Sequence, residues 1–399
     1  MKRFKLLTFL LFVLSAAVYA EDEIPRINIT HGPYLQNVSE TEATIVWLTD
    51  KPSIGWVELA ADGNNSFYAE EHAKLFDTKN GVKRTTTVHT VKLHGLTPGT
   101  RYRYRVFAQE VLKHSWHRIV YGDYAATNVY SRKPLTFTTC DTKAPTTTFA
   151  VVNDIHADND LLTNLMGRCD LPSTDFVIYN GDMVSVSKDE EQLFKGFIDT
   201  SVKLFAAEKP MYYTRGNHET RGEFATEVQN YLSPCIEHLY YTFRQGPAFF
   251  VMLDTGEDKP DSDIEYAGIT DYDNYRTEQA KWLAQVLESD EYKSAPIKII
   301  VAHIPPTASD GAVGLDEDWH GNVEVEKKFM PLLRKAHPDI MLCGHLHCFI
   351  HHKPTAQTPF PVIVNSNTSV IKAKATSKSL QLEIIDKDGK TLDKFSIEK

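Results

Sequence analysis

The chain has 399 residues, of which 42% are hydrophobic and 11% aromatic, so it can bury a full core in more than one domain. Its formal net charge of −10 argues against a broad basic face for a nucleic-acid backbone. We therefore expect no binding of nucleic-acid duplexes, although a local metal site could still attract a phosphate.

A short apolar segment near the first residue predicts export. Basic residues precede an apolar run over residues 6–18, and Val18-Tyr-Ala20 offers small residues where a signal peptidase cleaves. An uncleaved anchor is the alternative, but about 13 apolar residues fall short of the ~20 that span a bilayer. We expect a signal peptide over residues 1–20, a periplasmic or secreted mature chain, and no transmembrane segment after cleavage.

Residues 24–140 carry the pattern of a small β-sandwich. Short runs such as Thr41–Thr49 alternate between apolar and polar residues and are separated by turn residues. A Pro-Gly turn then enters a strand in which Tyr102, Tyr104 and Val106 share one face. Tyr102 stands where a tyrosine corner would hold the turn. This stretch resembles the Leu-x-Pro-x-Thr-x-Tyr signature of fibronectin type III domains, which implies a sandwich but no chemistry.

After a polar, threonine-rich linker near residues 140–148, the chain changes to α/β order. Apolar, strand-like runs alternate with amphipathic segments that predict helices over residues 190–205, 278–287 and 324–336. From Pro361 onward, further strand-like runs predict a meander that completes the second sheet. We expect a second domain over residues 147–399.

Five apolar runs in this second region end in residues that can bind metals. Each run has the length and composition of a buried strand, so the polar residues after it lie at a strand end. One Asp or His at such a place is usually a satisfied core residue, but five strand ends in one region indicate a site. The runs with their ends are Phe149–His156, Phe176–Asp182, Met211–His218, Ile297–His303 and Asp339–His347.

The side chains at these strand ends are carboxylates, imidazoles and one amide, without cysteine. This mixed nitrogen and oxygen set suits Mn, Zn or Fe and disfavours a closed structural zinc site. Asp182 can bridge two metal ions ~3.5–4 Å apart, a spacing that clamps an in-line displacement at phosphorus. With Asp154 and Asp182 as the only anionic ligands, two divalent ions leave an excess charge of about +2. A small phosphorylated substrate fits such a cationic pocket.

In order along the chain, these residues resemble the motifs of the calcineurin-like metallophosphoesterase superfamily. The family motifs are Asp-x-His, Gly-Asp, Gly-Asn-His, a lone His and Gly-His-x-His. The resemblance covers residues 147–399 and implies an α/β/β/α sandwich, and the β-sandwich before it resembles the architecture of purple acid phosphatases. The matching residues are Asp154-Ile-His156, Gly181-Asp182, Gly216-Asn-His-Glu219, His303 and Gly344-His-Leu-His347.

The resemblance also implies a centre of two divalent or mixed-valence metal ions, drawn from Mn, Zn or Fe. His218 would lie beside the metals and protonate the leaving oxygen or stabilise the charge that develops on it, with packing beneath a ligand loop as the alternative. Asp182, shared by both metals, is the second catalytic candidate. The implied ligands are Asp154, His156, Asp182 and His347 for one metal and Asp182, Asn217, His303 and His345 for the other.

Two positions depart from the pattern of the purple enzymes. Those enzymes carry Gly-Asp-x-x-Tyr, whose tyrosinate binds ferric iron and gives the colour, and they commonly have Asp-x-Gly in the first motif. Here Ser185 stands at the tyrosine position and His156 at the glycine position. We therefore expect a colourless centre, and Ser185 is a weak partner for orienting His218.

Three further residues are candidates for substrate contact. Arg221 follows the Gly-Asn-His-Glu motif and offers a guanidinium fork to phosphate oxygens, with a surface ion pair as the alternative. Trp319 and His320 lie in a long loop over residues 305–322, which follows His303 directly and could act as a lid. The alternative is a loop that packs only on itself.

These features predict an exported phosphoesterase with a binuclear metal centre, which hydrolyses phosphate monoesters by attack of a metal-bound hydroxide. A phosphodiesterase or nucleotide phosphohydrolase is the alternative, because the same metal clamp serves both and only the pocket walls differ. A binding or adhesion protein built on the sandwich is a third hypothesis, which the complete set of ligand motifs disfavours. The sequence leaves the oligomeric state open.

Overall fold

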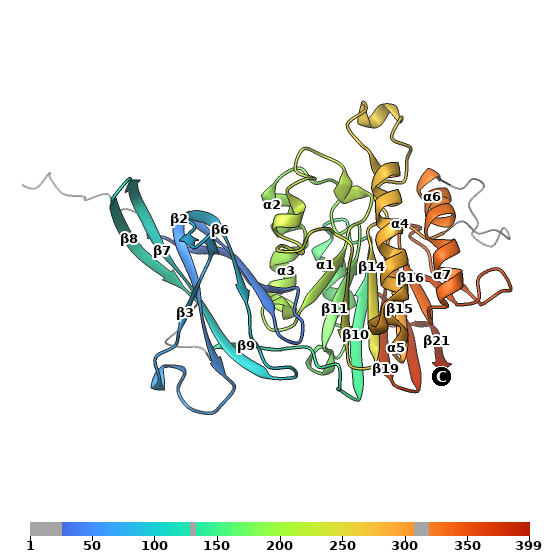
Figure 1. The fold of residues 1–399 in the computed structure, drawn as a ribbon, viewed down its shortest axis with the longest axis horizontal. Helices are drawn as coiled ribbons and strands as arrows, with labels where there is room; N and C mark the ends of the chain where they lie inside the picture. The colour runs from blue at the N-terminus through green and yellow to red at the C-terminus, as the bar shows by residue number, and fades with distance from the viewer. Residues whose placement is uncertain (1–25, 128–132, 307–318) are drawn as a thin grey trace, which may run out of the picture.

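The computed structural model describes residues 26–127, 133–306 and 319–399. They form two parts that lie side by side, an N-terminal β-rich part and an α/β part that carries the C-terminus (Figure 1). The predicted signal peptide lies outside the described residues. Among the helices that are described, none has the length and apolar character needed to cross a bilayer.

One long strand, β2, organises the β-rich part. Its first half pairs with β1 and β6, and its second half pairs with β3 and β7. Strands β8 and β9 then pair with β7, and β4 and β5 form a separate small hairpin. The strands are β1 (Ile29–Gln36), β2 (Ala43–Ala61), β3 (Lys74–Phe76), β4 (Thr78–Lys79), β5 (Val82–Lys83), β6 (Thr86–Leu93), β7 (Arg101–Ser115), β8 (Arg118–Ala126) and β9 (Leu135–Thr138).

Both halves of β2 contribute side chains to one core, Trp47 from the first half and Val57 from the second. A register shift between Leu48 and Ser53 separates the half that pairs with β6 from the half that pairs with β7. The backbone N–H of Thr97 donates to the Tyr102 hydroxyl at 2.9 Å, so the predicted tyrosine corner is confirmed, as is the predicted β-sandwich. The buried core includes Leu35, Trp47, Val57, Val91, Tyr104, Val106 and Phe137.

Two six-stranded sheets form the centre of the α/β part. The strand order is β12-β11-β10-β19-β20-β21 in the first sheet and β13-β14-β15-β16-β18-β17 in the second. Strands β10, β11 and β12 run parallel, as do β14, β15, β16 and β18. The strands are β10 (Thr146–Val152), β11 (Phe176–Asn180), β12 (Met211–Thr214), β13 (Tyr241–Gln245), β14 (Ala248–Leu253), β15 (Ile297–Ala302), β16 (Ile340–Cys343), β17 (Ile350–His352), β18 (Val362–Val364), β19 (Ser369–Thr376), β20 (Ser379–Asp386) and β21 (Thr391–Glu398).

Helices cover the outer face of each sheet, so the predicted α/β/β/α arrangement is confirmed (Figure 1). Phe149, Phe250 and Ile371 belong to the apolar layer between the sheets. The first sheet is covered by α1 (Asn159–Met166) and by a continuous helical run made of α2 (Glu190–Leu193), η3 (Phe194–Ile198), α3 (Asp199–Ser201) and η4 (Val202–Ala206). The second sheet is covered by α4 (Tyr272–Glu288), α5 (Asp290–Ser294), α6 (His320–Lys328) and α7 (Met330–Ala336).

The strands after Pro361 divide between the two sheets, which corrects the prediction of one meander in one sheet. Strand β18 pairs with β16, whereas β19 pairs with β10 on the other side of the core. Asn365 lies in the turn that crosses between them, and its amide donates to Asn153 Oδ1 at 2.7 Å and to the Ser369 carbonyl at 2.9 Å. These buried bonds hold β19 beside the loop that follows β10.

Candidate metal centre

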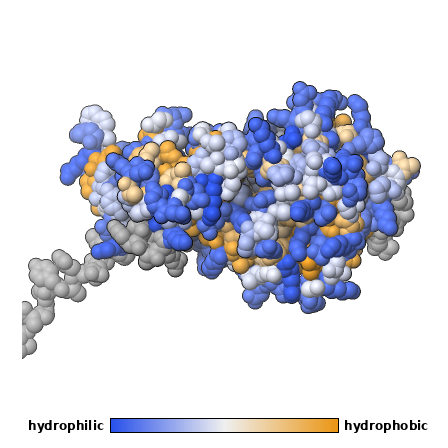
Figure 2. Space-filling view, turned by 90° about the horizontal axis from the view of Figure 1, so that it is seen from below, coloured by the Kyte–Doolittle hydropathy of each residue, from blue (hydrophilic) through white to orange (hydrophobic). Residues whose placement is uncertain are grey.

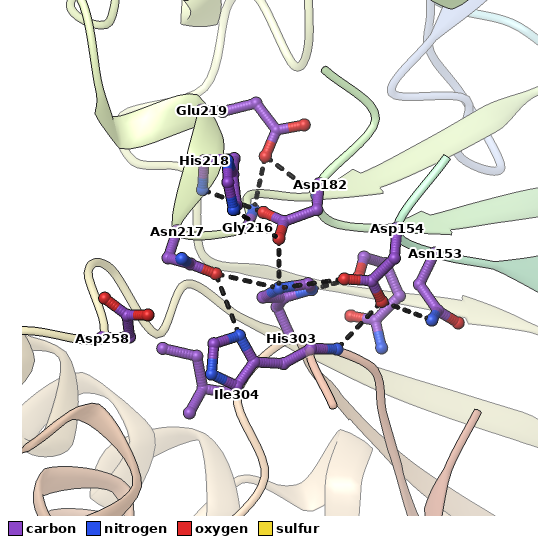
Figure 3. Close-up of polar contacts among 12 residues, drawn as sticks. Asn153, Asp154, Asp182, Gly216, Asn217, His218, Glu219, Asp258, His303 and Ile304 are labelled. Atoms are coloured by element: carbon purple, nitrogen blue, oxygen red, sulfur yellow. Dashed lines mark hydrogen bonds and ion pairs between the residues drawn. The ribbon is translucent and has the colours of Figure 1, made fainter. Parts of the chain in front are cut away.

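The five predicted ligand segments meet at one edge of the two sheets. They follow β10, β11, β12, β15 and β16, all parallel strands whose carboxyl ends point the same way. Figure 3 shows Asp154, Asp182, Asn217 and His303, from the loops after β10, β11, β12 and β15, turned toward one another. All eight residues named from the sequence as ligands or catalytic groups therefore lie together at this edge: Asp154, His156, Asp182, Asn217, His218, His303, His345 and His347.

One group of donor atoms gathers around Asp154. His347 Nε2 lies 3.2 Å from Asp154 Oδ1 and 3.3 Å from His156 Nε2. His156 Nε2 is in turn 4.0 Å from both Asp154 Oδ1 and Asp182 Oδ2. These atoms come within the range that a single cation can bridge, and they match the first implied ligand set.

A second group gathers around Asp182 and matches the second implied set. His303 Nε2 lies 3.2 Å from Asp182 Oδ2 and 3.2 Å from Asn217 Oδ1. His345 Nδ1 is 3.0 Å from the same Asn217 oxygen. Asp182 Oδ2 faces both groups, as a bridging carboxylate requires.

The side-chain atoms that face away from the centre form hydrogen bonds with neighbouring groups. These bonds fix the orientation of the side-chain atoms that face the centre. Asp154 Oδ2 accepts from Asn153 Nδ2 at 2.6 Å and from the His345 backbone N–H at 2.9 Å. Asp154 Oδ1 is buried and has no hydrogen-bond donor. His303 Nδ1 donates to the Asn180 carbonyl at 2.7 Å, which leaves Nε2 as the inward lone pair. This pattern of outer bonds and orphaned inward acceptors fits a metal site.

The buried carboxylates and histidines at the centre shift one another's pKa values. Burial acts to lower the pKa of His303, but Asp182 and Asp154 outweigh it and raise that pKa to about 10. Burial acts to raise the pKa of Asp182, but His303 and His218 hold it well below its usual range. Burial, reinforced by His303, lowers the pKa of His345 to about 3. The negative charge of Asp154 and Asp182 is balanced either by a proton on His303 or by a cation that replaces this proton.

Five of the predicted ligand residues have positive backbone φ angles. Positive φ angles are uncommon outside glycine, and they cluster at functional sites because the surrounding structure must hold them. The φ angles are 54° at Asp154, 49° at His156, 55° at Asp182, 74° at His345 and 54° at His347. The loops also approach one another closely, since a Cβ on Gly216 would lie 2.1 Å from Asp182 Oδ1.

Glu219 is a buried residue for which the sequence analysis predicts no role. Its carboxylate accepts from the backbone N–H groups of Asp182 (2.9 Å), Met183 (2.6 Å) and Gly216 (3.0 Å), so it ties the loop after β11 to the loop after β12. Burial and the Asp182 charge raise the pKa of Glu219 to about 7. Its place in the Gly-Asn-His-Glu motif was the only available signal.

Comparisons with known proteins agree with this geometry. Residues 147–349 match the family model of the calcineurin-like phosphoesterases, which is just over half of the chain. The chain belongs to the calcineurin-like phosphoesterase family. Residues 31–121 match a second family model, the N-terminal domain of purple acid phosphatases.

The similar proteins include several named purple acid phosphatases. Purple acid phosphatase 21 of Arabidopsis thaliana is 24% identical over 71% of this chain and 60% of its own length. Probable purple acid phosphatase 20 of the same plant is 23% identical over 79% of this chain and 70% of its own. The structure of a purple acid phosphatase from yellow lupin seeds superposes with a TM-score of 0.63, covering 92% of this chain and 74% of that one at 16% identity. At this identity the last comparison shows a shared fold.

Within the candidate site, Ser185 contacts two histidines through different atoms. Its carbonyl accepts from His218 Nδ1 at 2.8 Å, and its hydroxyl lies 3.3 Å from His156 Nδ1. The backbone of Ser185, rather than its side chain, therefore orients His218. This leaves His218 Nε2 facing the site, 3.9 Å from Asp182 Oδ2.

Arg221 lies near the centre but is held by two acidic residues of the loop after β14. Its guanidinium bonds Glu257 at 2.8 and 3.0 Å and Asp258 at 3.2 Å. Turning over the Asn217 amide would let its oxygen accept from Arg221 Nη2 at 3.0 Å and its nitrogen face His303 and His345. A cation at the centre favours the oxygen-inward orientation, because it attracts the oxygen and repels the amide hydrogens.

Trp319 and His320 take different positions although they are adjacent. The Trp319 ring meets His345 edge-on at 5.0 Å between ring centroids, and this residue is 46% exposed. His320 Nε2 instead contacts Asp273 Oδ1 of α4 at 2.8 Å. Residues 307–318 of the predicted lid lie outside the described residues.

Proposed function

We propose that this chain is an exported, metal-dependent phosphoesterase that hydrolyses phosphate monoesters. The observation that carries the proposal is the convergence of two donor groups on Asp182, with His218 Nε2 3.9 Å from the shared Asp182 Oδ2. Export is proposed from the leader-like residues 1–20, as expected from the sequence.

In this proposal, each donor group holds one ion from Mn, Zn or Fe. When bound, such a pair supplies Lewis-acid stabilisation of the phosphoryl oxygens and a nucleophile at neutral pH. Asn153 and Glu219 hold the carboxylates and loops in place, so little reorganisation accompanies the reaction. Asp154, His156, Asp182 and His347 would hold one ion, and Asp182, Asn217, His303 and His345 the other.

His218 is the proposed proton donor to the leaving oxygen. Its Nδ1–H is committed to the Ser185 carbonyl, so a proton on Nε2 points into the site and can be donated there. The remainder of the substrate would lie against Trp319, whose exposed ring borders His345.

A substrate panel tests the proposal. Phosphomonoesters, phosphodiesters and nucleotides are assayed after chelation and reloading with Mn, Zn, Fe, Mg or Ca. We expect monoester turnover that returns with Mn, Zn or Fe, and that Asp182→Asn loses together with bound metal because the shared anionic oxygen is gone. Asp160→Asn, an exposed change on α1, is the matched control.

Two results would contradict the proposal in different ways. Faster turnover of diesters than of monoesters would assign the same centre to a phosphodiesterase. Stoichiometric metal without turnover of any ester would indicate a binding protein. N-terminal sequencing of the protein recovered outside the cytoplasm tests export separately, with Glu21 expected as the first residue.

A further inference from the structure

The hairpin formed by β7 and β8 extends beyond the rest of the β-rich part. It lies at the end of the molecule away from the α/β part (Figure 1). Every residue from 112 to 119 is exposed, so both faces of the hairpin tip meet solvent. An isolated two-stranded tip gains little stability of its own, and its side chains are therefore not explained by core packing.

Large apolar side chains gather on this tip. Leu112 is 55% exposed, Trp116 91%, Ile119 43% and Tyr121 45%. Figure 2 shows hydrophobic surface at this end of the molecule as seen from below. Exposed apolar residues concentrated on one hairpin tip mark an interaction surface rather than ordinary surface scatter.

Trp116 is also unusual in its backbone. It occupies the hairpin turn with φ of 47°, a conformation that Gly, Asn or Asp adopts at lower energy. A bulky aromatic residue here is strained and almost fully exposed, so neither burial nor turn geometry accounts for it. This second observation points to a partner for the indole ring.

The charge on the tip is opposite to that of the whole chain. Residues 111–122 contain Lys113, Arg118 and two histidines and no acidic residue, in a chain of net charge −10. Among the described residues, no carboxylate pairs with Lys113 or Arg118. The two cations are thus available to an anionic partner.

We propose that the tip of this hairpin, residues 112–121, docks the protein on an anionic lipid surface. Trp and Tyr side chains favour the membrane–water interface, and basic side chains next to them bind anionic headgroups. Trp116, Leu112 and Ile119 enter the interface while Lys113 and Arg118 contact headgroups. Because the hairpin lies away from the α/β part, docking leaves the metal centre accessible (Figure 1).

Vesicle co-sedimentation tests this docking. The protein is mixed with phosphatidylcholine vesicles or with vesicles in which roughly a third of the lipid is phosphatidylglycerol, and we expect preferential binding to the second. Trp116→Ala should weaken the partition coefficient by about tenfold, from the lost apolar burial. Reversing both Lys113→Glu and Arg118→Glu should weaken it at least ~25-fold, since each basic side chain contributes roughly fivefold.

A control variant, Lys378→Glu with Lys390→Glu, makes the same charge change on exposed residues of the α/β part and should bind like the parent. Parent and variants share one N-terminus, so their difference reports the hairpin alone. Unchanged circular dichroism shows that each variant is folded. Equal binding of the parent to both vesicle types, or equal loss in the control, would overturn the proposal. So would a dimer in solution that Trp116→Ala converts to monomer, since the tip would then join two copies of this chain.

Discussion

At the scale of single residues, His218 offers the sharpest test of the chemistry. It lies near His156 and Asp182 but belongs to neither proposed ligand set, so His218→Ala should retain metal and lose rate. An alkyl phosphate has a poor leaving group and should lose about 10²–10⁴-fold in rate, whereas an aryl phosphate of an acidic phenol should lose much less. Steady-state kinetics on both esters, with metal content measured, check this. Equal losses on the two esters would assign His218 to charge stabilisation instead.

The clustering of the proposed ligands could be predicted because each follows an apolar run and fits an ordered set of motifs. Their supporting residues could not, because the bonds that define them join distant parts of the chain. Glu257 holds Arg221 across 36 positions, and Asn153 meets Asn365 across 212. Nothing in the local sequence distinguishes these acidic and amide residues from polar residues at the protein surface. The loop that contains Glu257 has no motif and carries no recognisable signal.

At the scale of elements, the strands that precede the candidate site were predicted, whereas the buried strand β14 and the start of helix α4 were not. Helix α4 begins at Tyr272, six residues before the predicted start at Glu278. Its first turn has no apolar periodicity and is held by Asp261, whose carboxylate accepts from the backbone N–H groups of Tyr272 (2.8 Å) and Asp273 (2.9 Å). The assignment of β19 to the first sheet likewise depends on pairing with the distant strand β10.

Strand β6 contains a histidine that should make the β-rich part sensitive to acid. His89 is fully buried, and its Nε2 contacts Ser53 Oγ at 2.8 Å. Burial, with a smaller contribution from Arg84, lowers the pKa of His89 to about 3. Between pH 6.5 and 3 the unfolded chain therefore binds a proton at this residue that the folded chain does not, so stability falls as pH falls. Between pH 6.5 and 5 the loss is about 2 kcal/mol.

Urea unfolding at several pH values measures this loss. His89→Gln keeps a polar group near Ser53 but cannot titrate, so its free energy of unfolding should fall less than that of the parent over the same pH range. The exposed His117→Gln is the matched control and should follow the parent. Identical pH slopes for the parent and His89→Gln would show that His89 does not contribute.

At the scale of the whole molecule, the two parts share a core. Tyr34 of β1 is fully buried, packs edge-on against Phe194 of η3, and donates its hydroxyl to the Tyr231 carbonyl at 3.0 Å. Beside it, His31 stacks on Phe194 and contacts Asp199 Oδ1 at 2.9 Å. The same apolar cluster includes Ile155 and Met183, so it extends beneath the loops that carry the proposed ligands.

This continuity predicts that the β-rich and α/β parts unfold together. Tyr34→Ala should lower the free energy of unfolding by about 3–5 kcal/mol, as for other buried aromatic residues, and Tyr34→Phe by only about 1 kcal/mol because it removes a single hydrogen bond. Urea unfolding followed by far-UV circular dichroism and by residual phosphatase activity measures both. Tyr121→Ala, on the exposed hairpin, should change little. If activity persisted through a first transition in Tyr34→Ala, the β-rich part would be unfolding alone, and the shared core would not couple the two parts.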